Sequence, residues 1–165
     1  MTEKISWWNA HFGEEENLQA TEAIRSNFLN EGALTRKLEH KFAEFLNINH
    51  VNAVPNGTVA LALCLWALGV QPRDEIIVPD LTFIATASAV HMVGATPIPV
   101  DISPGDFNLS PEKTELAINK NTKAIILVHI NGRPADIDAF QFLRKKTGLP
   151  IIEDNAQGLG SKIDE

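Results

Sequence analysis

Two short apolar runs in the second half of the sequence limit the folds open to this chain. Residues 124–128 read A-I-I-L-V, and residues 151–152 are both isoleucine. Between them, residues 137–147 show an amphipathic pattern that favours a helix, with Gly148 directly after it. Strands that carry apolar residues without alternation are typical of a parallel sheet covered on both faces. The pattern therefore predicts a β-α-β unit.

The same alternation of strand and helix patterns extends back to about residue 51. The remaining strands are expected at residues 51–54, 76–78 and 97–100. The intervening helices are expected at residues 58–68, at 82–93 and from Pro111, where Ser110 can cap the first turn. The resulting order, β-α-β-α-β-α-β-α-β, predicts a three-layer α/β/α fold with a mostly parallel sheet.

Two helical patterns precede the first predicted strand. They cover residues 14–29 and 34–46, with a break at 30–32 that contains Gly32. In the second helix one apolar stripe is formed by Leu34, Leu38, Phe42, Phe45 and Leu46. We therefore predict an N-terminal helical segment at residues 1–50 that packs on a larger domain at residues 51–165.

Composition excludes several classes of function. The 165 residues fall in the range of one domain, and the net charge of -7 without a basic run argues against nucleic acid or anionic membrane as the main partner. No stretch approaches the ~18 apolar residues of a membrane span, and the N-terminus lacks a signal-peptide pattern. The single cysteine, Cys64, excludes an intramolecular disulfide and is expected to be a small buried residue. We expect a cytoplasmic protein.

Ligands of open α/β sheets bind beyond the carboxyl ends of the strands, so the segments that follow strands are searched first. Asn56, Gly57 and Thr58 join a predicted strand to a helix, where free N–H groups attract an anion such as phosphate. The same residues also suit a simple helix cap without a ligand. The spacing matches neither the dinucleotide nor the nucleoside-triphosphate glycine fingerprint.

Other side chains follow the remaining strands. The ring of Phe83 can lie against a planar ligand or pack into the core, and His129 can line a site or serve as a hydrogen-bonded structural residue. Asp154 can bind a metal, act as a base, or hold a protonated ring nitrogen. A metal site shared with Glu153 is disfavoured, because adjacent strand residues point to opposite faces. We predict no metal site, and the other histidines show no ligand spacing.

Taken together, five segments resemble the sugar aminotransferases of the DegT/DnrJ family, which are fold type I enzymes dependent on pyridoxal phosphate. The resemblance runs in order from about Gly13 to the last residues. It is carried by V-P-N-G-T-V-A-L-A-L (54–63), D-E-I-I-V-P-D-L-T-F-I-A-T (74–86), G-A-T-P-I-P-V-D-I (94–102), T-K-A-I-I-L-V-H-I-N-G (122–132) and I-I-E-D-N-A-Q-G-L-G-S-K (151–162).

The resemblance implies a role for each matching residue. Gly57 and Thr58 would bind the cofactor phosphate, and Phe83 would stack on the pyridine ring. Asp154 would pair with the ring nitrogen and serve in catalysis, while Gln157 would lie near the ring hydroxyl. The partners implied are an amino donor, usually glutamate, a nucleotide-linked keto sugar, and a second copy of the full-length protein in a homodimer. The pathways implied are those of amino sugar and polysaccharide biosynthesis.

The family pattern also extends beyond this sequence. In the family the lysine that forms the Schiff base lies in a later S-F-x-x-x-K type motif, followed by a small C-terminal domain, whereas Lys162 matches only the G-S-K stretch. The chain is therefore expected to be the N-terminal part of the enzyme, with an incomplete cofactor-binding domain. Two alternatives remain: a sugar dehydratase that uses pyridoxamine phosphate, with histidine in place of the lysine, and an inactive fragment.

Overall fold

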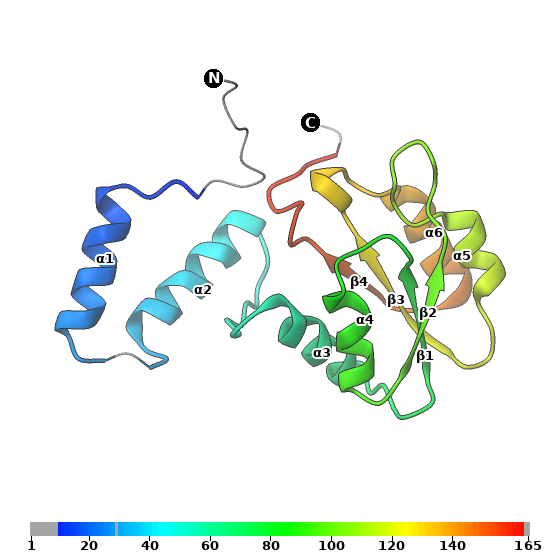
Figure 1. The fold of residues 1–165 in the computed structure, drawn as a ribbon, viewed down its shortest axis with the longest axis horizontal. Coiled ribbons are helices and arrows are strands. Elements are labelled where there is room, and N and C mark those ends of the chain that lie inside the picture. The colour runs from blue at the N-terminus through cyan, green and yellow to red at the C-terminus, as the bar shows by residue number, and fades with distance from the viewer. Residues whose placement is uncertain (1–9, 29, 164–165) are drawn as a thin grey trace, which may run out of the picture. The chain divides into compact units, whose positions relative to one another are not determined.

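The computed structural model describes residues 10–28 and 30–163, which divide into two compact units at the boundary between Ala53 and Val54. The first unit contains α1 (Glu14–Arg25) and α2 (Ala33–Leu46), shown in Figure 1. The first helix ends before residue 29, the predicted end, which itself lies outside the described residues. It ends because Asn27 takes a left-handed conformation with φ 54°.

The second helix matches its predicted range, and most of its apolar stripe is exposed. Gly32 precedes α2 in an extended conformation, and no residue of this helix is buried. Leu34 is 41% exposed and Phe45 67% exposed. The predicted packing of the first segment on the following domain therefore stays a prediction.

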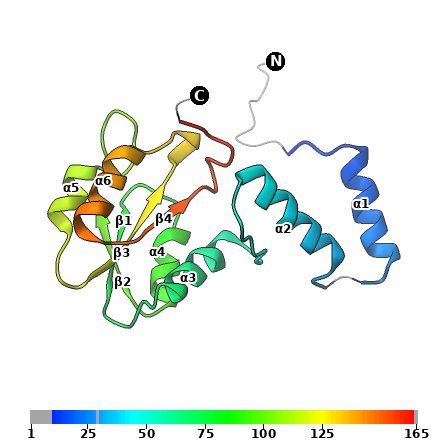
Figure 2. The same ribbon diagram turned by 180° about the vertical axis from the view of Figure 1, so that it is seen from behind.

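The second unit is a four-stranded parallel sheet with helices on both faces. The strand order is β2-β1-β3-β4, so β1 and β3 are central. Figures 1 and 2 show α3 and α4 on one side of the sheet and α5 and α6 on the other. The elements are α3 (Gly57–Ala67), β1 (Glu75–Pro79), α4 (Ala85–Met92), β2 (Thr96–Val100), α5 (Pro111–Ala117), β3 (Thr122–Val128), the 3-10 turn η1 (Ile130–Gly132), α6 (Ile137–Thr147) and β4 (Ile151–Asp154). The predicted three-layer α/β/α class is confirmed.

Each face of the sheet has its own core, because successive strand residues point to opposite sides. Beneath α3 and α4 lie Ile76, Val78, Ile126 and Ile152, packed against Leu61, Leu65 and Val90. Beneath α5 and α6 lie Ile77, Ile125 and Leu127, packed against Phe140 and Leu143. Both central strands are therefore buried on two sides, as their unbroken apolar sequences predict.

Local signals define the ends of the helices in this unit, and Ser110, Pro111 and Gly148 act as expected. The Ser110 hydroxyl accepts a hydrogen bond from the Lys113 N–H, with Pro111 at the first helical position of α5. The Asp136 carboxylate caps α6 through the Ala139 N–H, and Gly148 ends that helix with φ 74°. These ends follow from contacts a few residues apart, which explains why the sequence alone locates them.

The predicted strand at residues 51–54 is wrong, because this segment has no strand conformation. It spans the boundary between the two units, and the Ala53 N–H donates to the Glu39 carboxylate at 2.8 Å instead of to a neighbouring strand. The helix predicted at 82–93 also begins later, at Ala85. Phe83 consequently belongs to the loop after β1.

The predicted burial of Cys64 is wrong as well. Leu61, Ala62 and Leu65 form the stripe of α3 that faces the sheet, and Cys64 lies outside this stripe and is exposed. Because α3 is apolar around its whole circumference, composition alone does not show which of its faces is covered.

Two phenylalanines of α6 allow a matched test of this core. Phe140 is 1% exposed and Phe142 is 67% exposed. We expect F140A to lower the free energy of unfolding by about 3–5 kcal/mol, since it removes a buried ring and leaves a cavity. We expect F142A to change it by less than about 0.5 kcal/mol. Urea denaturation followed by circular dichroism measures both, and equal losses would contradict this description of the core.

Candidate functional site

The residues predicted to form a site all belong to the second unit and lie at the carboxyl edge of its sheet. Phe83 follows β1, a turn at residues 129–135 follows β3, and Asp154 is the last residue of β4. These three strands are neighbours in the sheet. The N-terminus of α3 belongs to the same edge, because α3 packs on the sheet and the chain runs from its C-terminal end into the start of β1.

The start of α3 presents unpaired donors. The Asn56 side chain caps the helix by accepting a hydrogen bond from the Val59 N–H at 3.0 Å. Among the described residues, no protein atom accepts a hydrogen bond from the N–H of Gly57 or Thr58. A Cβ atom built on Gly57 would meet no atom within 4 Å. This open end carries the positive pole of the helix, which suits an anion such as phosphate.

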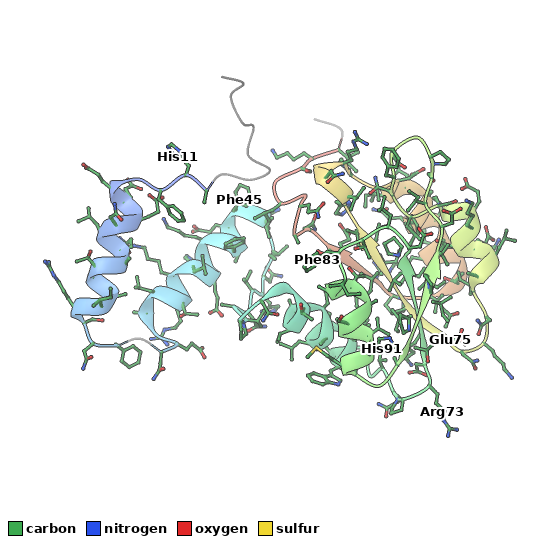
Figure 3. All side chains as sticks on the ribbon, in the orientation of Figure 1. His11, Phe45, Arg73, Glu75, Phe83 and His91 are labelled. Carbon is green, nitrogen blue, oxygen red and sulfur yellow. The ribbon has the colours of Figure 1, made fainter. Side chains whose placement is uncertain are left out.

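The ring of Phe83 is available to a ligand. It is 70% exposed, so the alternative of a core position is wrong. Figure 3 shows Phe83 toward the opposite end of the sheet from Arg73 and Glu75. The loop before α4 is held by a hydrogen bond of 2.9 Å between the hydroxyl groups of Thr82 and Thr86.

Asp154 and Glu153 turn to opposite faces of the sheet, as strand alternation predicts. Asp154 shares its side with Ile152, which belongs to the core beneath α3 and α4. Its half-buried carboxylate accepts a hydrogen bond from the Ala156 N–H at 3.1 Å through Oδ1. Asp154 therefore faces the side of the sheet that carries α3 and the loop of Phe83.

Glu153 pairs with His129 on the other face. The Nε2 atom of His129 lies 3.1 Å from Oε2 of Glu153, and the imidazole is 6% exposed while the Glu153 side chain is 51% exposed. This hydrogen bond holds the pKa of the Glu153 carboxyl below its ordinary value, against a smaller opposing effect of burial. Of the two readings of His129, the hydrogen-bonded structural one is confirmed.

Gln157 lies in the loop after β4 with a defined contact. Its side-chain oxygen Oε1 accepts a hydrogen bond of 2.6 Å from the backbone N–H of Asn131. Two residues near this contact were not identified from the sequence as part of a site. They are Asn131 and Asn108, and Asn108 is 2% exposed and bonds to the turn at residues 129–135. Asparagine is ordinary in loops, and nothing local in the sequence indicates contacts across 22 to 26 positions.

The five predicted residues share an edge but do not bond to one another. Among the described residues, no hydrogen bond joins Thr58, Asp154 and Gln157 directly. A hollow of about 590 Å³ lies on the opposite side of the sheet, lined in part by Leu127, Phe140 and Glu153, and it contains none of the five. No cluster of three or more histidine, cysteine or acidic residues suited to a metal occurs in the described ranges.

The chemistry at this edge suits one kind of ligand. Backbone donors at a helix start bind an anionic group, an exposed aromatic ring covers a planar one, and a carboxylate favours a protonated ring nitrogen. A planar heteroaromatic ring that carries a phosphate combines these features. The parallel sheet places the chain in the class of open α/β proteins, whose ligands bind beyond the carboxyl ends of the strands.

Comparison with known proteins narrows the class to one family. The model of the DegT/DnrJ/EryC1/StrS aminotransferase family matches residues 10–165. The chain belongs to this family, which confirms the resemblance noted from the five motifs.

One relative by sequence is UDP-2-acetamido-2-deoxy-3-oxo-D-glucuronate aminotransferase of Pseudomonas aeruginosa, 44% identical over 130 residues that cover 79% of this chain and 36% of the relative. A solved structure of S. venezuelae DesV in complex with a ketimine intermediate has a TM-score of 0.82 and 38% identity over 89% of this chain and 41% of that one. NtdA from Bacillus subtilis with bound cofactor PMP has a TM-score of 0.86 and 35% identity over 89% of this chain and 34% of NtdA. The chain thus spans well under half the length of these relatives, and its fold is that of part of a fold type I aminotransferase.

No helix among residues 10–28 and 30–163 is both long enough and apolar enough to cross a membrane.

The Glu153 pair makes stability depend on pH in a defined direction. A carboxyl whose pKa is lower in the folded state stabilises the fold above its unfolded pKa, about 4.3 for glutamate. That contribution is lost as the pH falls below this value toward the folded pKa. We expect E153Q to lose less stability than wild type between pH 5 and pH 3, by under about 1 kcal/mol because a half-exposed carboxylate is screened.

Urea denaturation at several pH values measures this difference. E22Q, a change at an exposed position of α1, serves as the control and should follow the wild-type profile. A steeper acid loss in E153Q than in wild type would contradict the assigned role of His129 in lowering this pKa.

Proposed function

We propose that the protein containing this chain transfers an amino group, from glutamate as donor, to the keto group of a nucleotide-linked sugar, with pyridoxal phosphate as cofactor. Membership of an aminotransferase family supports the reaction type. The printed name of the P. aeruginosa relative, an aminotransferase of a UDP-linked 3-oxo sugar, supports the substrate class. The bound PMP in the NtdA structure supports the cofactor.

The observation that carries the proposal is the shared carboxyl edge. Three features lie at this edge of the sheet. They are the open N–H donors of Gly57 and Thr58 at the start of α3, the exposed ring of Phe83 after β1, and the half-buried carboxylate of Asp154 at the end of β4. An anion site, a flat apolar surface and an acid correspond in kind to the phosphate, the ring face and the ring nitrogen of the cofactor.

Each residue then has one task. Gly57 and Thr58 would bind the phosphate, and Phe83 would stack on the ring. Asp154 would hold a proton on the ring nitrogen, and Gln157 would donate its amide N–H toward the ring hydroxyl, since its Oε1 already accepts from Asn131. When bound, the cofactor supplies an electron sink whose strength depends on that protonated nitrogen.

We also propose a homodimer and a cytoplasmic location for the full-length protein. Leu63 and Trp66 lie one turn apart on α3 and are 42% and 52% exposed. An apolar helix face of this kind is suited to contact with a second copy. The single cysteine is consistent with a reducing compartment. A separate proposal concerns the domains: residues 51–165 would form part of the cofactor-binding domain, with residues 1–50 as a helical segment packed on it.

Replacing Asp154 tests the reaction and the site together. In the intact protein we expect wild type to convert glutamate and bound pyridoxal phosphate to 2-oxoglutarate and the amino form of the cofactor, seen as a change in the absorption spectrum of the cofactor. D154N should slow this conversion by about a hundredfold or more, since the amide cannot keep the ring nitrogen protonated. D138N, a matched change at an exposed position of α6, should react at the wild-type rate. Wild type without any spectral change on adding glutamate would contradict the proposed function.

The phosphate site has its own test at Thr58. We expect T58V to weaken binding of pyridoxal phosphate by about tenfold, because an isosteric change removes one hydroxyl donor to the phosphate. T96V, at the exposed first position of β2, serves as the control. Titration followed by absorbance gives both affinities, and equal affinities for T58V and T96V would remove Thr58 from the site.

A further inference from the structure

The turn at residues 129–135 is closed by the side chain of its first residue. The Nδ1 atom of His129 accepts a hydrogen bond of 3.1 Å from the backbone N–H of Ala135. An accepting Nδ1 carries no proton, so the ring proton lies on Nε2, which donates to Glu153 at 3.1 Å. The imidazole is almost fully buried and makes both of its hydrogen bonds to protein atoms. The turn and strand β4 are thereby tied to one ring.

Asn108 holds the same turn from a different part of the chain. Its Oδ1 accepts a hydrogen bond from the Ile130 N–H at 3.1 Å, and its Nδ2 donates to the carbonyl oxygens of Arg133 at 3.3 Å and Pro134 at 3.2 Å. The asparagine is itself buried. The turn therefore has hydrogen bonds at its start and its end, which limits its freedom to move.

The loop that carries Gln157 rests on this turn. The Asn131 N–H donates to Oε1 of Gln157, and the Ser161 hydroxyl donates to the Gly132 carbonyl at 3.3 Å. Gly158 packs against the base of the His129 side chain: a Cβ atom on Gly158 would lie 2.8 Å from Cβ and 3.5 Å from Cγ of His129, the first closer than Cβ atoms approach. The loop that carries Gln157 thus packs directly against the base of the His129 side chain.

The strand end that carries Asp154 belongs to the same assembly. The backbone N–H of His129 donates to the Asp154 carbonyl at 3.2 Å, which extends the pairing of β3 with β4 by one step. The His129 side chain thus bonds to Ala135 at the end of the turn and to Glu153, the residue before Asp154, while the backbone N–H of His129 bonds to Asp154 itself.

We propose that His129 is a positioning residue for the cofactor ring: through the turn at 129–135, through Gly158 and through its bond to Glu153 in β4, it sets the places of the Gln157 amide and the Asp154 carboxylate without touching the ring itself. The inference rests on the proposed function, because the ring is the ligand that these two groups would meet. Its structural half, the control of the Gln157 loop by His129, concerns this chain alone.

Two variants test the proposal in the intact protein. H129N shortens the side chain so that it no longer reaches Glu153, while G158A leaves the histidine unchanged but inserts a methyl group against its Cβ. Amide hydrogen exchange at Asn131 reports whether the contact to Gln157 persists. Titration with pyridoxal phosphate gives the affinity and the absorption maximum of the bound cofactor, and thermal melting gives the stability.

We expect both variants to speed exchange at Asn131 about tenfold, to weaken cofactor binding about tenfold, and to shift the absorption maximum of the bound cofactor. In E153Q the amide oxygen of the new glutamine can still accept the hydrogen bond from Nε2 of His129. This variant should therefore leave the exchange rate, the cofactor affinity and the absorption maximum near their wild-type values. H91N, an exposed histidine at the far end of α4 from Phe83, is the matched control and should change none of them (Figure 3).

A lower melting temperature in H129N and G158A, with affinity and absorption maximum within twofold of wild type, would overturn the proposal and leave His129 a purely structural residue. Absence of cofactor binding by wild type would reject the proposed function instead. In that case the exchange rates alone decide: unchanged exchange at Asn131 in both variants overturns the control of the loop by His129, and faster exchange supports it.

Discussion

The pairing of β3 with β4 is the interaction on which the candidate site depends. The two strands run parallel from Ile125 opposite Ile151 to Val128 opposite Asp154, and the His129 N–H adds one more bond to the Asp154 carbonyl. This register decides which acid faces which side. A shift by one residue would exchange the faces of Glu153 and Asp154, because side chains alternate along a strand.

The same pairing brings two loops together at the carboxyl edge. The turn after β3 and the loop after β4 leave adjacent strand ends, so backbone and side-chain groups more than twenty positions apart bond to each other. Asn108 adds a third segment to this contact. The loop of Gln157 is thus built on a scaffold of ordered backbone, which is the usual way in which a rigid sheet positions functional side chains.

Prediction from the sequence succeeded where the cause is local. The helix at residues 137–147 was expected with both of its ends, since an amphipathic pattern and a following glycine suffice to define it. It failed at residues 51–54, where a short segment containing two valines takes no strand conformation. It also failed for the burial of Cys64 and for the core alternative at Phe83, since exposure depends on what covers a helix or loop. Membership of the family was recognised because five motifs recur in order, although each is weak alone.

By itself, the sequence determined the alternation of strands and helices from residue 57 onward and the parallel class of the sheet. It also placed a turn suited to an anion, an aromatic residue and an acid beside strand and helix ends. Those features depend on residue type and on spacing within one element. Only the tertiary structure decided that Phe83 is exposed, that Asp154 and Glu153 face apart, and that His129 and Asn108 hold the turn that contacts Gln157. These facts follow from strand register and from contacts between distant segments, which no local pattern encodes.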